Sequence, residues 1–217
     1  MNHGCLHNIA PHTRAVIISA CTLPTMSQPS LSWKITLGST FIVSSGAACF
    51  LPIPLVRILP LPAWLILFQW LYDEYNFLRP WLRVVPSPER VAYNAALGRY
   101  YTSWRDSLGT ITPAISLPIT WISSVRLAYA DRSDSTRCLL WLGGLAGAIA
   151  HMPAGGKEFP LTKIMAAGGS EIKNGKEKDA LGALGTWLDM HRWRLIWVDT
   201  IPLICFGAAA VLAARGG

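Results

Sequence analysis

The sequence predicts an all-α integral membrane protein, a four-helix bundle with an additional interfacial helical segment. Only 14% of the 217 residues are charged and 52% are apolar, whereas soluble domains carry about 25% charged residues. From Trp193 to Ala214 nearly every residue is apolar, which is about the length that crosses a bilayer. The ten Trp residues suit membrane interfaces, where an apolar ring with one N–H group is stable.

Two regions differ in composition. Residues 1–33 are rich in His, Ser, Thr and Pro and have no periodic apolar face, so we expect a disordered N-terminal tail. The short apolar run 15–23 in this tail leaves a targeting signal open as the alternative. Residues 34–217 are expected to form the membrane domain, with four spans.

The four expected spans are apolar stretches separated by charged or polar segments. Lys34 and Arg57 bracket the first span. Gly143, Gly144 and Gly147 are expected points of close helix packing in the third span, which can continue past its proline to about residue 165. The expected spans cover residues 35–56, 107–125, 138–165 and 193–214.

Two further helical segments are expected between the first and second spans. Residues 61–82 begin apolar but then include Asp73, Glu74 and Arg79, which favours an interfacial or re-entrant helix over a span. Residues 88–106 are rich in Tyr, Trp and Arg and are expected to form a helix with an aromatic face.

The charge pattern and the motifs exclude several classes of function. The net charge of +7 is scattered between apolar spans, which argues against a nucleic-acid surface and favours a lipid bilayer as partner. No phosphate loop, dinucleotide fingerprint, haem-attachment motif or metal-ligand spacing is present. The five Cys residues are far apart and form no metal or disulfide pattern. We therefore expect neither a cofactor nor a metal.

The segment that leads into the fourth span carries the best candidate for chemistry. Trp187, His191 and Arg194 are spaced four and three residues apart, so a helix places them on one face. An imidazole titrates near neutral pH and can act as a general base, although a merely solvated His is the alternative. Arg194 can stabilise an oxyanion, or it can extend to lipid headgroups.

Other polar and aromatic residues belong to the same expected membrane face. Converging aromatic rings with a few polar groups favour a small-molecule pocket, and an ordinary interfacial aromatic belt is the alternative. Asp199 within the fourth span is either functional or a hydrogen-bonding partner across helices, and His151 is expected to bond at a helix end. The expected substrate-binding residues are Trp70, Tyr75, Tyr100, Trp104, Thr162 and Trp187.

These motifs resemble a family of small four-span membrane proteins, the anthrone-oxygenase-like proteins of fungal polyketide tailoring. The family pattern is Trp, then His or Asn four residues on, then Arg three further, as in Trp187, His191 and Arg194. Two more segments resemble the family, Phe159-Pro160-Leu161-Thr162 and the Gln69–Tyr75 stretch with its Trp. Residues 167–170, Ala-Gly-Gly-Ser, depart from the family's Asn-containing turn.

The resemblance covers about residues 35–214 and implies a function. It implies a cofactor-independent monooxygenase of secondary metabolism that oxidises an aromatic polyketide, of the anthrone to anthraquinone type, with molecular oxygen. In that reading His191 and Arg194 are catalytic and the ligand is a hydrophobic aromatic molecule. A non-catalytic membrane scaffold and a small-molecule carrier are the alternatives.

Overall fold

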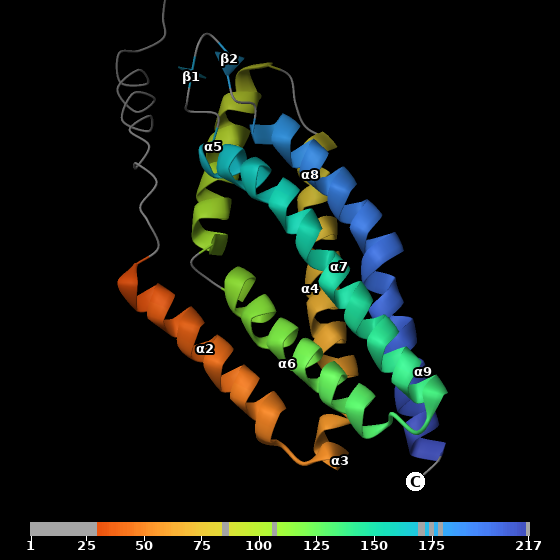
Figure 1. Cartoon of the computed structure of the whole chain (residues 1–217). Coiled ribbons are helices and arrows are strands. Elements are labelled where there is room, and N and C mark those ends of the chain that lie inside the picture. The colour runs from red at the N-terminus through yellow and green to blue at the C-terminus, as the bar shows by residue number, and fades with distance from the viewer. Residues whose placement is uncertain are drawn as a thin grey trace, which may run out of the picture.

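The computed structural model describes residues 30–83, 87–105, 108–168, 172–173, 176–177 and 180–215. Helices dominate this part of the chain, and one short antiparallel pair of strands joins Ile172 to Glu177 and Lys173 to Lys176 (Figure 1). In chain order the elements are α2 (Leu31–Phe50), α3 (Ile53–Val56), α4 (Pro60–Leu78), the 3-10 helix η1 (Arg79–Arg83), α5 (Ser87–Arg105), α6 (Leu108–Ala130), α7 (Ser135–Ala166), β1 (Ile172–Lys173), β2 (Lys176–Glu177), α8 (Ala180–Arg194), the π-helical turn η2 (Leu195–Asp199) and α9 (Thr200–Arg215).

Local sequence signals set several helix ends. The Ser30 side chain accepts a hydrogen bond from the Trp33 amide at 3.2 Å and caps the start of α2. Asp134 caps α7 in the same way, since its carboxylate accepts from the Arg137 amide at 3.0 Å. The expected tail boundary after residue 33 is therefore too late, because helix α2 already begins at Leu31; residues 1–29 lie outside the described part of the chain.

Two helical segments are long and apolar enough to cross a membrane, Ile53–Leu82 and Ala180–Arg215. The pair Ser135–Pro153 and Gly156–Ala166 adds a third if this bent pair is one span. The second segment begins well before the expected start at residue 193, because α8, η2 and α9 follow one another without a break. The interpretation of residues 61–82 as too short and too charged for a span is wrong by length and composition.

The first two expected spans, residues 35–56 and 107–125, do not meet the same criterion in the described residues. The first forms α2 and α3, and the second forms α6. Ser and Thr recur along α2 and α6 and reduce their apolar character. The third expected span is helical as predicted, since α7 continues past Pro153 to Ala166. A complete four-span bundle is thus not established by this part of the chain.

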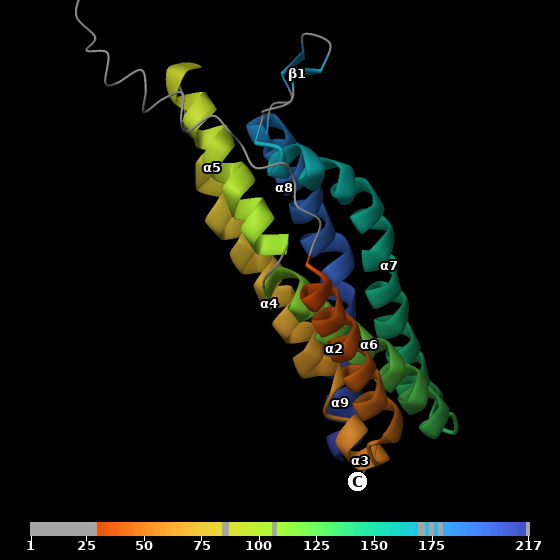
Figure 2. The same cartoon turned by 90° about the vertical axis from the view of Figure 1, so that its left-hand side faces the viewer.

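The helices run lengthwise beside one another, with α6 between α2 and α7 in Figure 1. Two hydrogen bonds fix the direction of α4 relative to α8 and α9: the Trp64 indole donates to the Asp199 carbonyl, and Leu71 lies opposite His191. Residue numbers rise along α4 as they fall from Asp199 to His191, so α4 runs antiparallel to the continuous segment of α8, η2 and α9. Figure 2 shows α5 extending the bundle at the end where α4 finishes and α8 starts.

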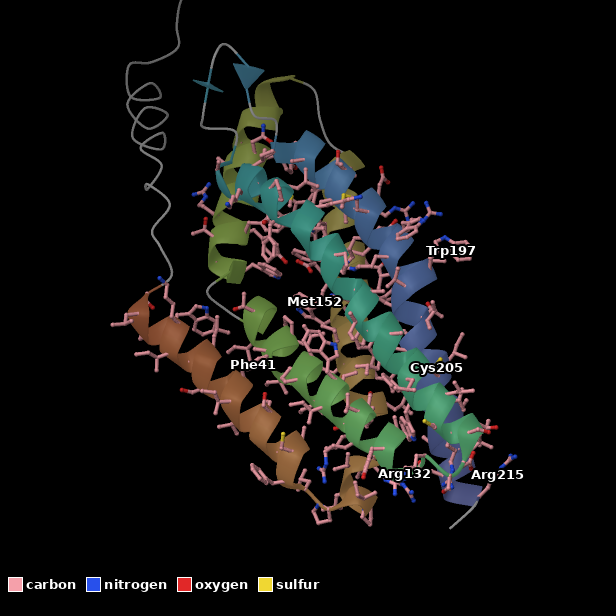
Figure 3. All side chains as sticks on the ribbon, viewed as in Figure 1. Phe41, Arg132, Met152, Trp197, Cys205 and Arg215 are labelled. Carbon is pink, nitrogen blue, oxygen red and sulfur yellow. The ribbon has the colours of Figure 1, made fainter. Side chains whose placement is uncertain are left out.

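Helix α2 lies at the outside of the bundle and packs on α6. Its Ile42, Val43 and Phe50 side chains are at least 70% exposed. On the opposite side of Figure 3, Trp197 likewise projects outward from the bundle and is 65% exposed. Large apolar side chains that face outward from several helices are more compatible with surrounding lipid than with water.

The predicted close packing at glycines of the third span is confirmed for α7 against α9. A Cβ atom added at Gly144 would overlap the Phe206 ring, and one at Gly147 would lie 2.8 Å from Pro202 Cδ. Glycine is required at both positions because the two helices approach too closely for a side chain.

Ion pairs and hydrogen bonds of charged side chains hold the end of the bundle near α3. Asp131, in the turn between α6 and α7, bonds to Arg57 Nη2 at 2.6 Å and accepts from the Trp141 indole at 3.0 Å. Arg126 donates to the carbonyls of Ala48 and Leu51 at the end of α2. These contacts join four helices and leave the opposite end to a different set of groups.

Candidate functional site

Helix α8 places Trp187, His191 and Arg194 on one buried face, as the spacing predicts. The next turn is π-helical, and the Thr200 hydroxyl donates to the Leu195 carbonyl five residues earlier at 2.8 Å. Such single π turns inside α-helices occur frequently at functional sites. The turn ends at Asp199, so it brings a second charged residue close to Arg194.

The ring nitrogens of His191 are both engaged. Nε2 lies 3.1 Å from the Leu71 carbonyl oxygen, which can only accept, so Nε2 carries the hydrogen. Nδ1 then accepts a hydrogen bond from Arg194 Nη2 at 3.1 Å. Trp187 stacks on the imidazole at a centroid distance of 4.3 Å. A proton added to Nδ1 would face a guanidinium, so this geometry favours a neutral, positioning imidazole over a general base.

Arg194 is the centre of the ionic contacts. Its Nη1 donates to both carboxylate oxygens of Glu158, at 2.7 and 2.8 Å. Its Nε lies 3.3 Å from Asp199 Oδ2, an ion-pair distance without hydrogen-bond alignment. The residue is only 2% exposed, so of the two alternatives for its side chain, the one in which it extends to lipid headgroups does not fit the structure. The guanidinium is instead buried between α7 and α8.

Asp199 joins this centre to a second imidazole. Its Oδ1 lies 2.8 Å from His151 Nδ1, and the residue is fully buried. The Trp64 indole donates to the Asp199 carbonyl at 2.8 Å and meets the His151 ring edge-on. The prediction that His151 bonds at a helix end is wrong, because His151 lies within α7 and pairs across to η2.

Sequence reasoning missed Glu74 as a member of the site. Glu74 is 6% exposed, and neither of its carboxylate oxygens has a hydrogen-bond partner among the described residues. Leu71, three residues earlier on the same face of α4, accepts from His191, so Glu74 lies one turn from the contact between α4 and α8. The missed signal is the spacing of Leu67, Leu71, Glu74 and Leu78, which places Glu74 in an otherwise apolar buried stripe of α4.

An aromatic cluster lies beside these charges, with Tyr101 at its centre. The Tyr101 ring is within 6.2 Å, centroid to centroid, of the rings of Tyr100, Trp104 and Trp187. Burial, with the nearby Glu74 carboxyl adding to it, raises the pKa of Tyr101 above its ordinary value and that of Tyr100 to about 12. Both phenols therefore keep their protons at neutral pH.

Most of the predicted substrate-binding residues lie around this cluster. Trp70 stacks on Trp104 at 5.8 Å, and Tyr75 packs against the cluster with Arg79 5.9 Å above its ring. Thr162 differs, because its hydroxyl donates to the Phe159 carbonyl of its own helix at 2.9 Å. The predicted residues that the fold brings together are Trp70, Tyr75, Tyr100, Trp104 and Trp187.

The described residues define a class of protein, a helical protein with two or three helices fit to cross a membrane and a charged centre buried beside aromatic rings. Within the described ranges, no group of three or more His, Cys, Asp or Glu is arranged to hold a metal ion. No family model, curated protein or solved structure matches the chain.

Proposed function

We propose that the protein is a multi-pass membrane oxygenase that oxidises an electron-rich aromatic polyketide, of the anthrone type, with molecular oxygen and without a bound cofactor. The observation that carries the proposal is the charged centre of Glu74, Glu158, His191 and Arg194 beside the aromatic cluster around Tyr101. Ionisable residues buried in helices fit to cross a membrane mark functional sites by default.

The chemistry needs a base, a cation and an aromatic surface. Loss of one proton from the methylene group of an anthrone gives an aromatic enolate, so this C–H bond is unusually acidic. A buried guanidinium stabilises the negative charge of an enolate oxygen more strongly than it would in water. Arg194 supplies that cation, and its contacts to Glu158 and His191 hold it in place. His191 is then a positioning residue that orients Arg194.

The oxygen step needs only the enolate and O₂. The enolate gives one electron to O₂, and the resulting radical pair combines to form a carbon–oxygen bond. The product is a peroxide anion, which takes up a proton. The second methylene proton then leaves as the O–O bond breaks. One oxygen atom remains as the new ketone and the other leaves as water, so the methylene carbon is oxidised by four electrons and O₂ is reduced by four.

Oxygen consumption by the purified protein in detergent tests the proposal. With an anthrone substrate, a chelator present and ¹⁸O₂ supplied, we expect one labelled oxygen atom in the quinone product, at a rate well above that of protein-free micelles. Arg194→Lys keeps the charge but loses the planar guanidinium, so turnover should fall by roughly a hundredfold. Arg192→Lys on the exposed side of α8 is the matched control. Rates equal to those of empty micelles would exclude the oxygenase function.

The buried carboxylates and imidazoles support a second candidate, a proton-coupled carrier. Trp64, which bonds to Asp199, and Glu74 are ten residues apart on α4, a distance of about 15 Å along the helix. The titratable groups from Asp199 to Glu74 therefore extend over roughly half of a bilayer core. Chains of Asp, Glu and His inside membranes serve as proton relays. Vesicles containing the protein and a pH-sensitive dye distinguish the two candidates: a carrier moves protons with its ligand and consumes no oxygen.

A further inference from the structure

Two buried polar groups of the aromatic end have no hydrogen-bond partner within the described part of the chain. They are the carboxyl group of Glu74 on α4 and the hydroxyl group of Tyr101 on α5. Tyr101 is 2% exposed and Glu74 is 6% exposed. Buried polar groups are paired in the great majority of cases, so two unpaired groups in one neighbourhood call for a physical explanation.

These two groups lie close to each other in the fold. Leu78, four residues after Glu74 on the same face of α4, packs in one buried cluster with Tyr101 of α5 and Trp187 of α8. Leu71, three residues before Glu74, accepts from His191, and His191 in turn accepts from Arg194. Glu74 is therefore the group through which the charged centre meets the aromatic cluster.

The other residues of the charged centre already make hydrogen bonds. Glu158 is bound twice by Arg194, and His191 bonds to Leu71 and Arg194. The Glu74 carboxylate is left with two acceptor oxygens, and the Tyr101 hydroxyl group with a donor and an acceptor. Together they can bond to one polar substituent of a ligand whose rings lie among the aromatic side chains.

We propose that Glu74 and Tyr101 form the polar end of a binding site for a flat phenol or aromatic ketone, and that Glu74 takes up the proton that this ligand releases. The binding part stands on the unpaired groups and the aromatic rings alone. The proton step rests on the proposed oxygenase function.

A C–H bond of the ligand breaks, its electron pair enters the ring system as an enolate, and the proton goes to the Glu74 carboxylate. Arg194 balances the new negative charge in place of the charge that Glu74 has lost. Glu74 later returns the proton to the oxygen that leaves as water, and is then ready for a second ligand.

Ligand binding tests the first part of the proposal. The probe is a hydroxyanthraquinone, and equilibrium dialysis against the purified full chain in detergent measures its affinity. Tyr101→Phe should weaken binding by about threefold to tenfold, the usual value of one hydrogen bond. Tyr72→Phe, at a half-exposed position of α4, is the matched control and should leave affinity unchanged. Equal affinities of the two variants would overturn the role of Tyr101.

Substitutions of Glu74 separate binding from proton transfer. Glu74→Gln keeps a donor and an acceptor, so affinity should stay within about threefold while turnover falls by about a hundredfold. Glu74→Leu should lower affinity as well. Asp73→Asn, at the exposed neighbouring position, is the control. Full turnover in Glu74→Gln would overturn the proton step, whereas binding without any turnover in the wild type would overturn the oxygenase function and leave the binding site.

Chemical modification of the wild-type protein gives a test that does not depend on variant folding. An apolar carbodiimide adds to carboxyl groups that lie in apolar surroundings, and mass spectrometry of peptides locates the adduct. We expect an adduct at Glu74 that is suppressed by hydroxyanthraquinone, and no comparable adduct at the ion-paired Glu158. Modification of Glu74 at the same rate with and without the ligand would overturn the site.

Discussion

Replacement of Arg194 by Met removes the positive charge from the buried centre and keeps most of the side-chain volume. Arg194 is the only side chain that the structure pairs with the Glu158 carboxylate by hydrogen bonds, at 2.7 and 2.8 Å, within the described residues. It also donates to His191 and lies 3.3 Å from Asp199 Oδ2. The variant therefore leaves one buried carboxylate without a hydrogen bond and weakens two further contacts.

The expected loss follows from the cost of an unpaired buried charge. Breaking a buried ion pair by removing one partner costs about 3–5 kcal/mol, which lowers the ratio of folded to unfolded protein by roughly a hundredfold to several-thousandfold. Glu158→Gln should cost less, because Arg194 keeps Asp199 and His191 beside it. The double variant removes both charges, so its loss should be smaller than the sum of the single losses by about 0.5–3 kcal/mol.

Denaturant titration of the purified protein in detergent measures these free energies of unfolding, with far-UV circular dichroism reporting the loss of helix. Arg192→Met is the matched control, because this Arg is two residues away on the exposed side of α8 and should cost little. The reasoning is refuted if Arg194→Met is as stable as Arg192→Met. Strict additivity in the double variant would show that Arg194 and Glu158 do not interact in the folded protein.

Three further predictions concern packing and the membrane. Gly144→Ala should destabilise the protein by about 1–3 kcal/mol, because the added methyl overlaps Phe206; Gly207→Ala, with open space at its Cα, is the control, and equal unfolding midpoints would contradict the close packing. The protein should leave membranes with detergent and not with carbonate, and its recovery in a carbonate supernatant would end the membrane interpretation. Deletion of residues 1–29 should leave membrane insertion intact, measured by the same fractionation, and failure to insert would assign a targeting role to that segment.

Local periodicity explains what could be predicted of the fold. The helical character of the chain, the continuation of α7 past its prolines and the glycine contacts of α7 follow from residue types and short spacings. The shared face of Trp187, His191 and Arg194 follows from 3.6 residues per turn. The number of spans was less predictable, because Asp73, Glu74 and Arg79 argued against a span in residues 61–82, whereas in the structure the helix extends back to Ile53 and the whole segment is long and apolar enough to cross a membrane.

The candidate site depended on contacts that no short spacing contains. His191 meets Leu71 across 120 positions of the chain, Asp199 meets His151 across 48, and Arg194 meets Glu158 across 36. Periodicity states which residues share a helix face, but the rotation and the sliding of one helix against another decide which faces meet. That is why the sequence left extension of Arg194 to lipid headgroups open as an alternative, whereas the structure buries this side chain.

The sequence by itself determined a helical, apolar chain and a helix face that carries Trp187, His191 and Arg194, because both are properties of residues a few positions apart. Only the tertiary structure decided that both nitrogens of His191 are occupied and that Arg194 is held by Glu158. It also decided that Glu74 is buried one turn from the cluster of Tyr101, with no hydrogen-bond partner among the described residues. The physical reason is that hydrogen bonding and burial depend on what the neighbouring helices place opposite each side chain.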